Sequence, residues 1–297
     1  MLADDTIRTA LRTAWHLQPD GCTQVATGPA GSAGSVVAGD RRYVAALVPA
    51  VRRARFEAGL AAAEHLARLG HDVGAPLRAA DGALCVSAGD QLLALLDFMP
   101  GRPLDGADPV DQQWWGDRLG AAHRGLAGFQ HPGLPGWHWL RPDAGHLTVA
   151  AWLRPAVTRA VTALTKLQVT DRLTVGTLHG DPRPGAFLLD PDTGRIGMVS
   201  WGSVLSGPLV YDLATAVRHA GGIRHAAELV AAYAAAGPVP VAEIEGSLDT
   251  LLRFHWAAEA DACARLLSAC ATASEPDPAA VDRGWAGLGA ARAALLD

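Results

Sequence analysis

Lysine is almost missing from this sequence: Lys166 is the only one in 297 residues, and arginine supplies the rest of the 25 Lys and Arg side chains. Any mechanism that needs a lysine elsewhere in the chain is therefore excluded. Long apolar runs are missing too, since none reaches the roughly 18 residues that a membrane-spanning helix needs. The formal net charge of −5 excludes the basic excess that is typical of general nucleic-acid and anionic-membrane binders.

Cysteine is scarce, and none of the four cysteines forms the Cys-x-x-Cys spacing of redox motifs and many zinc sites. Residues 1–5 contain two aspartates and lead into no apolar signal core, so we expect a cytoplasmic protein with reduced cysteines and no metal site. Hydrophobic residues make up 49% and charged residues 19%, which excludes a disordered chain. The length fits one large domain or two lobes.

Residues 1–98 predict a small lobe that is rich in strands. Apolar residues at helical spacing predict helices over 6–17 and 53–69, the second ended by Gly70. Between and after them, turn residues separate apolar runs, which is typical of β-hairpins. The expected strands are 35–38, 42–48, 83–87 and 91–98. The Pro- and Gly-rich run 99–104 breaks the pattern, and we expect a hinge there.

Residues 105–297 predict a larger, mostly helical lobe. Its expected helices are 109–129, 148–167, 208–220, 224–236 and 241–268. The exception is 173–205, where short apolar runs alternate with turn residues such as those of 190–194. Loops between short strands are where functional side chains gather, so we expect the site there.

The segment 178–202 contains His179-Gly180-Asp181 and ends in Ser200-Trp201-Gly202. It resembles the aminoglycoside phosphotransferase family, in which a His-Gly-Asp loop precedes an asparagine and, after a short hairpin, a metal-binding aspartate. Further resemblance covers 42–47, 55–70, 98–104 and 208–214. It implies an α+β, two-lobed protein-kinase-like fold with a small β-rich N-lobe (1–98), a hinge (99–104) and a larger, mostly helical C-lobe (105–297).

The resemblance implies a catalytic role for Asp181, with His179 as its support. Three other family positions have lost their chemistry. The asparagine falls on Ala186, the metal-binding aspartate on Ser200 and the strand lysine on Ala46. A methyl group cannot ligate a hard cation, and a neutral hydroxyl does not replace a carboxylate.

The partner of the family's strand lysine matches Glu57 best and Glu64 second. We expect Ala46 to face the cleft between the lobes, with Glu57 on the adjacent helix and no basic group paired to it. Asp212, at the expected start of a helix, is interpreted as an acid that offsets the helix dipole.

Ligand contacts are expected at two further places. The glycine-rich stretch 28–34 and the hinge would contact a nucleotide through Gly31, Gly34, Phe98 and Gly101, although a mobile turn explains the glycines equally well. An aromatic segment over 131–142 and the helix near 254–265 suggest a substrate-lining surface. Its expected members are Trp137, Trp139, Trp256 and Glu259. A packed loop and a solvated helix face are the plainer alternatives.

The sequence thus predicts a degenerate member of the family, a pseudokinase. It would bind a small molecule or a protein partner, or use Asp181 for acid/base chemistry, for example in natural-product biosynthesis. We expect no magnesium-dependent cofactor, weak metal-independent ATP binding at most, and neither nucleic acid nor membrane as partner. The alternative is an active ATP-dependent small-molecule O-phosphotransferase of the antibiotic-modifying type. In that case Asp190 or Asp192 would hold the metal, and Arg41, Arg42 or Arg52 would reach the phosphates.

Overall fold

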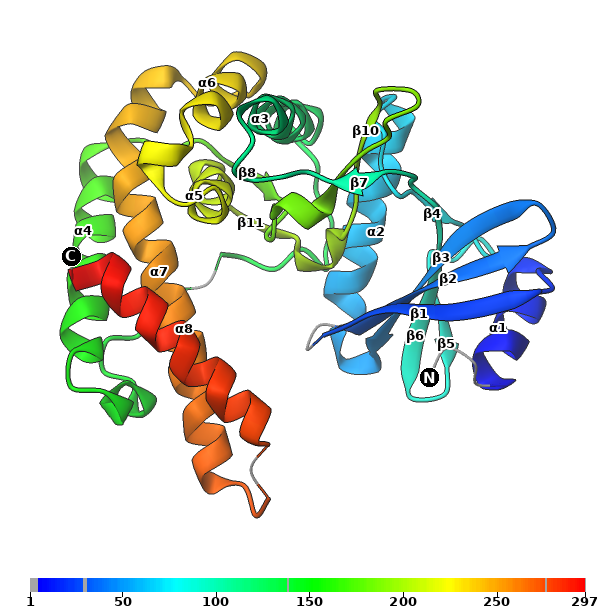
Figure 1. Cartoon of the computed structure of the whole chain (residues 1–297), viewed down its shortest axis with the longest axis horizontal. Coiled ribbons are helices and arrows are strands. Elements are labelled where there is room, and N and C mark those ends of the chain that lie inside the picture. Colours follow the sequence, from blue (N-terminus) through cyan, green and yellow to red (C-terminus); the bar gives the residue numbers. More distant parts are fainter. Residues whose placement is uncertain (1–4, 29–30, 138, 276, 297) are drawn as a thin grey trace.

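The computed structural model describes residues 5–28, 31–137, 139–275 and 277–296. Figure 1 shows a small lobe built on a β-sheet and a larger lobe built almost entirely of helices. The long helix α2 lies between the sheet and the helical lobe. The predicted α+β class, with one small strand-rich lobe and one larger helical lobe, is confirmed.

The small lobe is an antiparallel sheet with a helix on each face. The strand order is β1-β2-β3-β6-β4, and β5 pairs with the other part of β6. The strands are β1 (Gly21–Gly28), β2 (Gly31–Ala38), β3 (Arg41–Pro49), β4 (Pro76–Leu77), β5 (Val86–Ala88) and β6 (Gln91–Asp97). Side chains of β3 alternate between the two faces. Tyr43, Ala45 and Leu47 pack with α1 (Asp5–Trp15), whereas Ala46 and Val48 pack with α2 (Arg53–Arg68).

The two predicted hairpins are present, with their turns at Gly39 and Gly89, both at positive φ. Strand β1 was not predicted, because its glycine, threonine and alanine residues carry no alternating apolar pattern. Pairing with β2, in which Gly28 lies opposite Gly31, defines it instead. Pro29 and Ala30, inside the expected nucleotide-covering stretch, lie outside the described residues.

The large lobe packs its helices around one apolar core. They are α3 (Pro109–Gly125), α4 (Leu153–Thr170), α5 (Val210–His219), α6 (Ala227–Ala236), α7 (Val241–Thr272) and α8 (Pro278–Leu296). Fully buried side chains such as Trp115, Leu213 and Phe254 fill the space between them. The predicted helices are all present, but α8 was not expected. Alanine and glycine make up much of it, so its apolar stripe is faint. No helix in the described ranges is long and apolar enough to cross a bilayer.

Two small sheets at the junction of the lobes carry the segment 178–202. One contains β7 (Arg102–Pro103), β9 (Phe187–Leu189) and β10 (Ile196–Met198), and the other pairs β8 (Val175–Leu178) with β11 (Leu205–Pro208). Strand β11 was not predicted, since it follows directly on the site and contains glycine and proline. The two sheets hold the His-Gly-Asp loop between β8 and β9.

Candidate functional site

The loop after β8 is fixed by one buried carboxylate, that of Asp212 in the first turn of α5. Asp212 accepts the backbone N–H of His179 at 2.6 Å and that of Gly180 at 3.0 Å. It also accepts from His123 Nε2 at 3.1 Å, while His123 Nδ1 lies 2.8 Å from the Tyr233 hydroxyl. A buried charge needs such donors, because an unpaired one is very costly. Asp212 therefore shapes the loop, a larger role than the helix-dipole one predicted for it.

The His179 side chain is a structural support inside this loop. Its Nε2 lies 2.9 Å from the Val199 carbonyl, its Nδ1 lies 3.3 Å from the Asp181 backbone N, and its ring packs edge-on against Trp201. These partners fit a neutral imidazole that donates from Nε2. Burial lowers the pKa of His179, partly offset by the nearby charge of Asp212. His179 therefore orients the loop as a neutral side chain.

Two further contacts hold the loop, and each joins residues that are far apart in the sequence. Gly180 has φ +84°, and a Cβ there would lie 1.9 Å from the Ser203 carbonyl oxygen, so only glycine fits without strain. The indole of the buried Trp115 donates to the Pro182 carbonyl at 2.9 Å. Neither this contact nor the His123–Tyr233 pair could be predicted, because Trp115, His123 and Tyr233 lie far from the motif along the chain.

The Asp181 carboxylate is partly exposed at the tip of the loop. Arg183 contacts one of its oxygens at 3.1 Å, and the Asp181 side chain keeps 32% of its accessible surface. His219, at the end of α5, is close enough for the Asp181 charge to act on it. Partial desolvation and the charge of Arg218 lower the pKa of His219, against the opposing effect of Asp181. Asp181 is thus positioned to meet a ligand, and its catalytic role stays a prediction.

The two residues at the family's metal-holding positions, Ala186 and Ser200, are brought together. Ala186 precedes β9 and Ser200 follows β10, and the Val199 backbone N donates to the Ala186 carbonyl at 2.8 Å. The Ala186 methyl is fully buried, whereas Ser200 is exposed and has φ +71°. Magnesium is usually held by one or two carboxylates together with substrate phosphates. This donor set, a methyl and a hydroxyl, does not fit a magnesium ion.

The alternative metal ligands, Asp190 and Asp192, lie at the opposite end of the same hairpin. Asp190 accepts the Asp192 backbone N–H at 3.0 Å and the Thr193 hydroxyl at 2.7 Å, which closes the β9–β10 turn. Three residues of strand, about 10 Å, separate that turn from Ala186. Among the residues described, no group of three or more His, Cys, Asp or Glu side chains is arranged to hold a metal.

Ala46 lies on β3 as predicted, on the side of the sheet that faces α2. Its cross-strand neighbours are Ala33 and Ala94, so this part of the face presents only methyl groups. Ala46 packs against an apolar cluster that contains Phe56 and Leu60 of α2. Apolar packing therefore occupies the place where the family would have an ion pair.

The prediction that Glu57 lacks a basic partner is wrong. Arg53, one turn earlier on α2, places Nη1 3.0 Å from Glu57 Oε1, because residues four apart share a helix face. Both side chains are partly exposed, at 47% and 36%, and Arg53 also reaches Ser87 of β5. The second candidate, Glu64, forms a two-pronged pair with Arg78. Neither acid is paired to a group on β3.

Helix α2 is fixed to the site by contacts that the sequence did not reveal. The Arg55 guanidinium donates to the carbonyls of Ser203 and Val204, the latter at 3.1 Å. Burial lowers the pKa of Arg55, with the charge of Arg52 as a second cause. Gly59 lies against the segment after Ser200, where a Cβ would come within 2.1 Å of the Trp201 carbonyl oxygen.

The expected nucleotide contacts remain predictions. Gly31 and Gly34 lie in β2, and Gly34 pairs with Ala45 of β3. The hinge residue Gly101 has φ +128° and lies against the Leu189 backbone. The Phe98 ring is covered by the Arg42 guanidinium, 5.6 Å from its centroid.

The candidate phosphate-binding arginines on β3 are thus engaged at the hinge end. Arg42 covers Phe98, and Arg41 lies 3.9 Å from Asp97 and over the ring of Tyr43. Arg52 lies at the start of α2, and its charge acts on Arg55.

The predicted substrate-lining residues divide into two groups. Trp137 and Trp139 form an aromatic cluster with Tyr211 and Phe254, in which Trp139 keeps 44% of its surface. Trp256 and Glu259 lie on α7 and both contact Arg218 of α5. Trp256 lines a cavity on the large lobe. The substrate-lining role of all four residues stays a prediction.

The fold and the loop define a protein of the kinase-like class, and the sequence places it within that class. Residues 30–244 match the phosphotransferase enzyme family, and the chain belongs to that family. Over 201 residues it is 29% identical to an uncharacterized protein of Deinococcus radiodurans. That match covers 60% of this chain and 56% of the relative, so it spans little more than half of the relative's length.

Solved structures share the whole fold at low sequence identity. An amicoumacin kinase in complex with AMP-PNP and Ca²⁺ superposes with a TM-score of 0.73 at 16% identity, covering 99% of this chain and 93% of that one. A microcompartment-associated aminopropanol kinase gives 0.73 at 19% identity, with coverage of 97% and 95%. A spectinomycin phosphotransferase in complex with ADP and spectinomycin gives 0.68 at 12% identity, with coverage of 96% and 93%. At these identities the likeness establishes the fold alone.

Proposed function

We propose that this chain is a degenerate phosphotransferase, a pseudokinase, that binds a small molecule without magnesium-dependent phosphoryl transfer from ATP. One observation carries the proposal: Ala186 and Ser200 meet at one end of the β9–β10 hairpin, while Asp190 is occupied with the turn at the other end. The residues that transfer phosphate act as a unit, so losing two metal ligands and the lysine together is hard to offset.

The apolar packing of Ala46 supports the same proposal. Replacing a buried ion pair by apolar side chains can be neutral or stabilising. The cluster of Phe56 and Leu60 is such a replacement, and it leaves no lysine to contact the phosphates. ATP would then bind weakly and without metal, through the hinge. Four unpaired cysteines support a cytoplasmic location for this function.

A second candidate function is an active small-molecule O-phosphotransferase. The observation that favours it is the supported Asp181 loop, whose carboxylate is partly exposed where a substrate hydroxyl could approach. The solved relatives are named for such kinases. The same loop also suits a protein that binds a ligand and uses Asp181 for acid/base chemistry other than phosphoryl transfer.

A thermal-shift titration separates the two functions. Ligands that bind the native state raise its melting temperature, and the rise grows with the ratio of ligand concentration to dissociation constant. The pseudokinase is expected to show the same small ATP-dependent shift in EDTA and in excess Mg²⁺. An active phosphotransferase would show a larger shift with Mg²⁺, and that result would contradict the proposal.

A further inference from the structure

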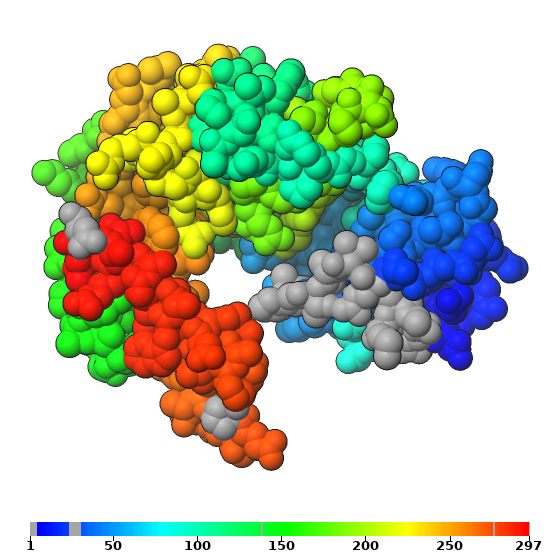
Figure 2. Space-filling view, in the orientation of Figure 1, coloured from blue at the N-terminus to red at the C-terminus, as the bar shows by residue number. Residues whose placement is uncertain are grey.

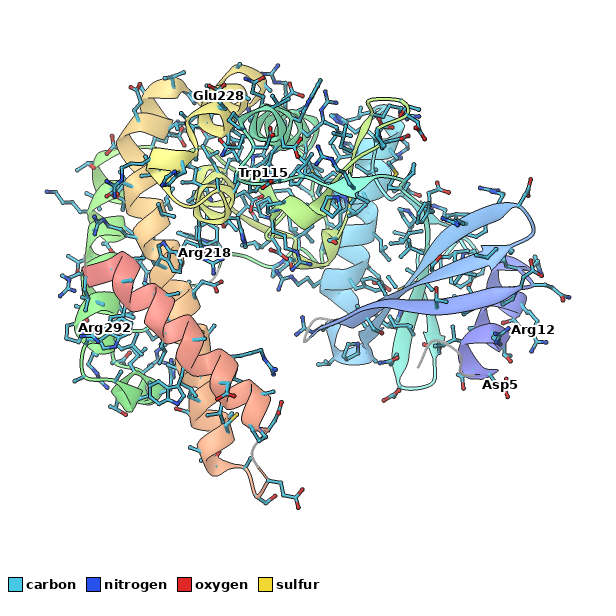
Figure 3. The ribbon with its side chains drawn as sticks, in the orientation of Figure 1. Asp5, Arg12, Trp115, Arg218, Glu228 and Arg292 are labelled. Carbon is cyan, nitrogen blue, oxygen red and sulfur yellow. The ribbon has the colours of Figure 1, made fainter. Side chains whose placement is uncertain are left out.

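A cavity of about 450 Å³ lies on the large lobe, between the end of α5, the turn at 221–222, α7 and the last turns of α8. Its lining residues are Arg218, Gly221, Gly222, Asp249, Leu252, Arg253, Trp256 and Ala294. Figure 2 shows the molecule hollowed between the small lobe and these helices. Arg218 is labelled in Figure 3, at the end of α5 beside α7. The volume suits a small organic ligand.

Arg218 is the central polar group of this cavity, and its hydrogen-bonding capacity is only partly used. Its guanidinium lies 4.6 Å from the Trp256 ring centroid, and Nη2 is 3.5 Å from Glu259 Oε2, at the limit of a hydrogen bond. Nη1 lies 3.3 Å from His219 Nε2. The Nε atom is buried, and no acceptor for it exists in the described part of the chain. Because Nε has almost no accessible surface, a ligand oxygen would bind at the Nη groups, whose present contacts are long for hydrogen bonds.

A second arginine faces the same cavity. Arg253 lies on α7, where its Nε is 3.0 Å from Asp249 Oδ2, and both side chains of this pair are more than half exposed. Such an exposed pair contributes little and can be exchanged for another acceptor. Leu252, Trp256 and Ala294 supply apolar walls. Two arginines beside an apolar wall suit a planar oxyanion attached to a flat apolar body.

We propose that this cavity binds a small organic oxyanion, a carboxylate or phosphate ester with an apolar body, through Arg218 and Arg253. The inference rests on the proposed ligand-binding function and goes beyond it by specifying that the ligand is negatively charged. The two carboxylates at the cavity, Asp249 and Glu259, already pair with Arg253 and Arg218, so a cationic ligand would have to displace one of these arginines and lie beside both guanidinium groups. Spectinomycin, the substrate named for one solved relative, carries basic amino groups and is therefore disfavoured here.

The test uses phenylacetate, phenyl phosphate, phenethylamine and spectinomycin as probes for the full chain, by ligand-observed NMR and calorimetry. We expect one or both oxyanions to bind with a dissociation constant of about 1 mM or lower, as suits a fragment-sized ligand. The tighter of the two identifies the class as carboxylate or phosphate. Tighter binding of either amine, or no binding of either oxyanion, would overturn the proposal.

Variants locate the site. Arg218→Gln and, separately, Arg253→Gln are expected to weaken oxyanion binding about tenfold or more, because each removes a charge-assisted contact. Arg283→Gln is the matched control: like Arg253 it pairs with an exposed aspartate, Asp277, and it is 65% exposed against 54% for Arg253. Equal affinity in all three variants would contradict the assignment. The probes contain no nucleoside, so this outcome is independent of the ATP titration.

Discussion

The two sides of the Asp181 loop are built in different ways. On one side, buried polar side chains hold the backbone: Asp212 accepts from two loop N–H groups and Trp115 donates to a loop carbonyl. On the other side, where a phosphotransferase holds its metal, lie Ala186 and the exposed Ser200. Buried hydrogen bonds therefore set the shape of this loop, which does not require a bound metal. The loop can therefore be retained for another ligand.

Removing the carboxylate of Asp212 is expected to have the largest effect. Asp212→Ala would leave the N–H groups of His179 and Gly180 and the imidazole of His123 without their acceptor. Breaking a buried charged network in this way costs about 3–5 kcal/mol of unfolding free energy. Urea denaturation measures it, with Asp143→Ala, an exposed pair with Arg141, as a control expected within about 0.5 kcal/mol. Equal losses in both variants would show that the loop support is unimportant.

Gly59→Ala tests the close contact between α2 and the segment that follows Ser200. Alanine favours helix by about 1 kcal/mol over glycine, yet a Cβ here would meet the Trp201 carbonyl at 2.1 Å. We expect the clash to dominate and to destabilise the protein by about 1–3 kcal/mol. Gly246→Ala on α7, where a Cβ meets nothing within 4 Å, should instead stabilise it. If Gly59→Ala stabilised the protein instead, α2 would not be held closely against the Trp201 carbonyl.

The pH dependence of stability tests whether His179 is neutral. Burial lowers the pKa of His179 in the folded state, so below about pH 6.5 the unfolded chain binds a proton that the native state does not. Stability is expected to be level above that pH and to fall below it by at most about 1.4 kcal/mol per pH unit for this group. His71 and His219, whose pKa values are also lowered, add to the slope.

The measurement is chemical denaturation between pH 7.5 and 5.5, with His179→Gln beside the parent. The variant should show a shallower fall, since it has one proton-binding group fewer. An unchanged slope would mean that His179 is protonated in the native state.

Glu57→Gln is expected to have the smallest effect. The Arg53–Glu57 pair is partly exposed, and such pairs contribute about 0.5 kcal/mol or less. Urea denaturation and ATP affinity should therefore both be nearly unchanged. A tenfold loss of ATP affinity would place Glu57 in a functional nucleotide site. That result would contradict the proposal that the nucleotide- and metal-binding chemistry has been lost.

The sequence predicted the parts of the fold that rest on local pattern. The alternation in β3 and the helical spacing in α2 and α7 each place an apolar face, so these elements were found. The resemblance located Asp181, Ala186 and Ser200 at one site. The two strands that were missed have no clear apolar alternation of their own and are defined by their partners: β1 by its hairpin with β2, and β11 by pairing with β8.

The supporting contacts of the site were missed because their residues are far apart in the sequence. Trp115 of α3 donates to the loop carbonyl of Pro182, 67 residues away, and His123 of α3 contacts Asp212, 89 residues away. The error at Glu57 has another cause. The prediction sought a partner across the cleft and overlooked Arg53, one helical turn away on the same face.

The most direct test of the proposed pseudokinase function is the effect of Mg²⁺ on ATP affinity, measured by calorimetry in EDTA and then in excess Mg²⁺. Ser200→Asp is the matched variant, because Ser200 is exposed and aspartate tolerates its left-handed backbone better than most residues. We expect a change of less than about twofold for the parent and tighter binding with Mg²⁺ for the variant. A tenfold tightening in the parent, equal to about 1.4 kcal/mol, would show that another acid holds the metal and would contradict the proposed pseudokinase function.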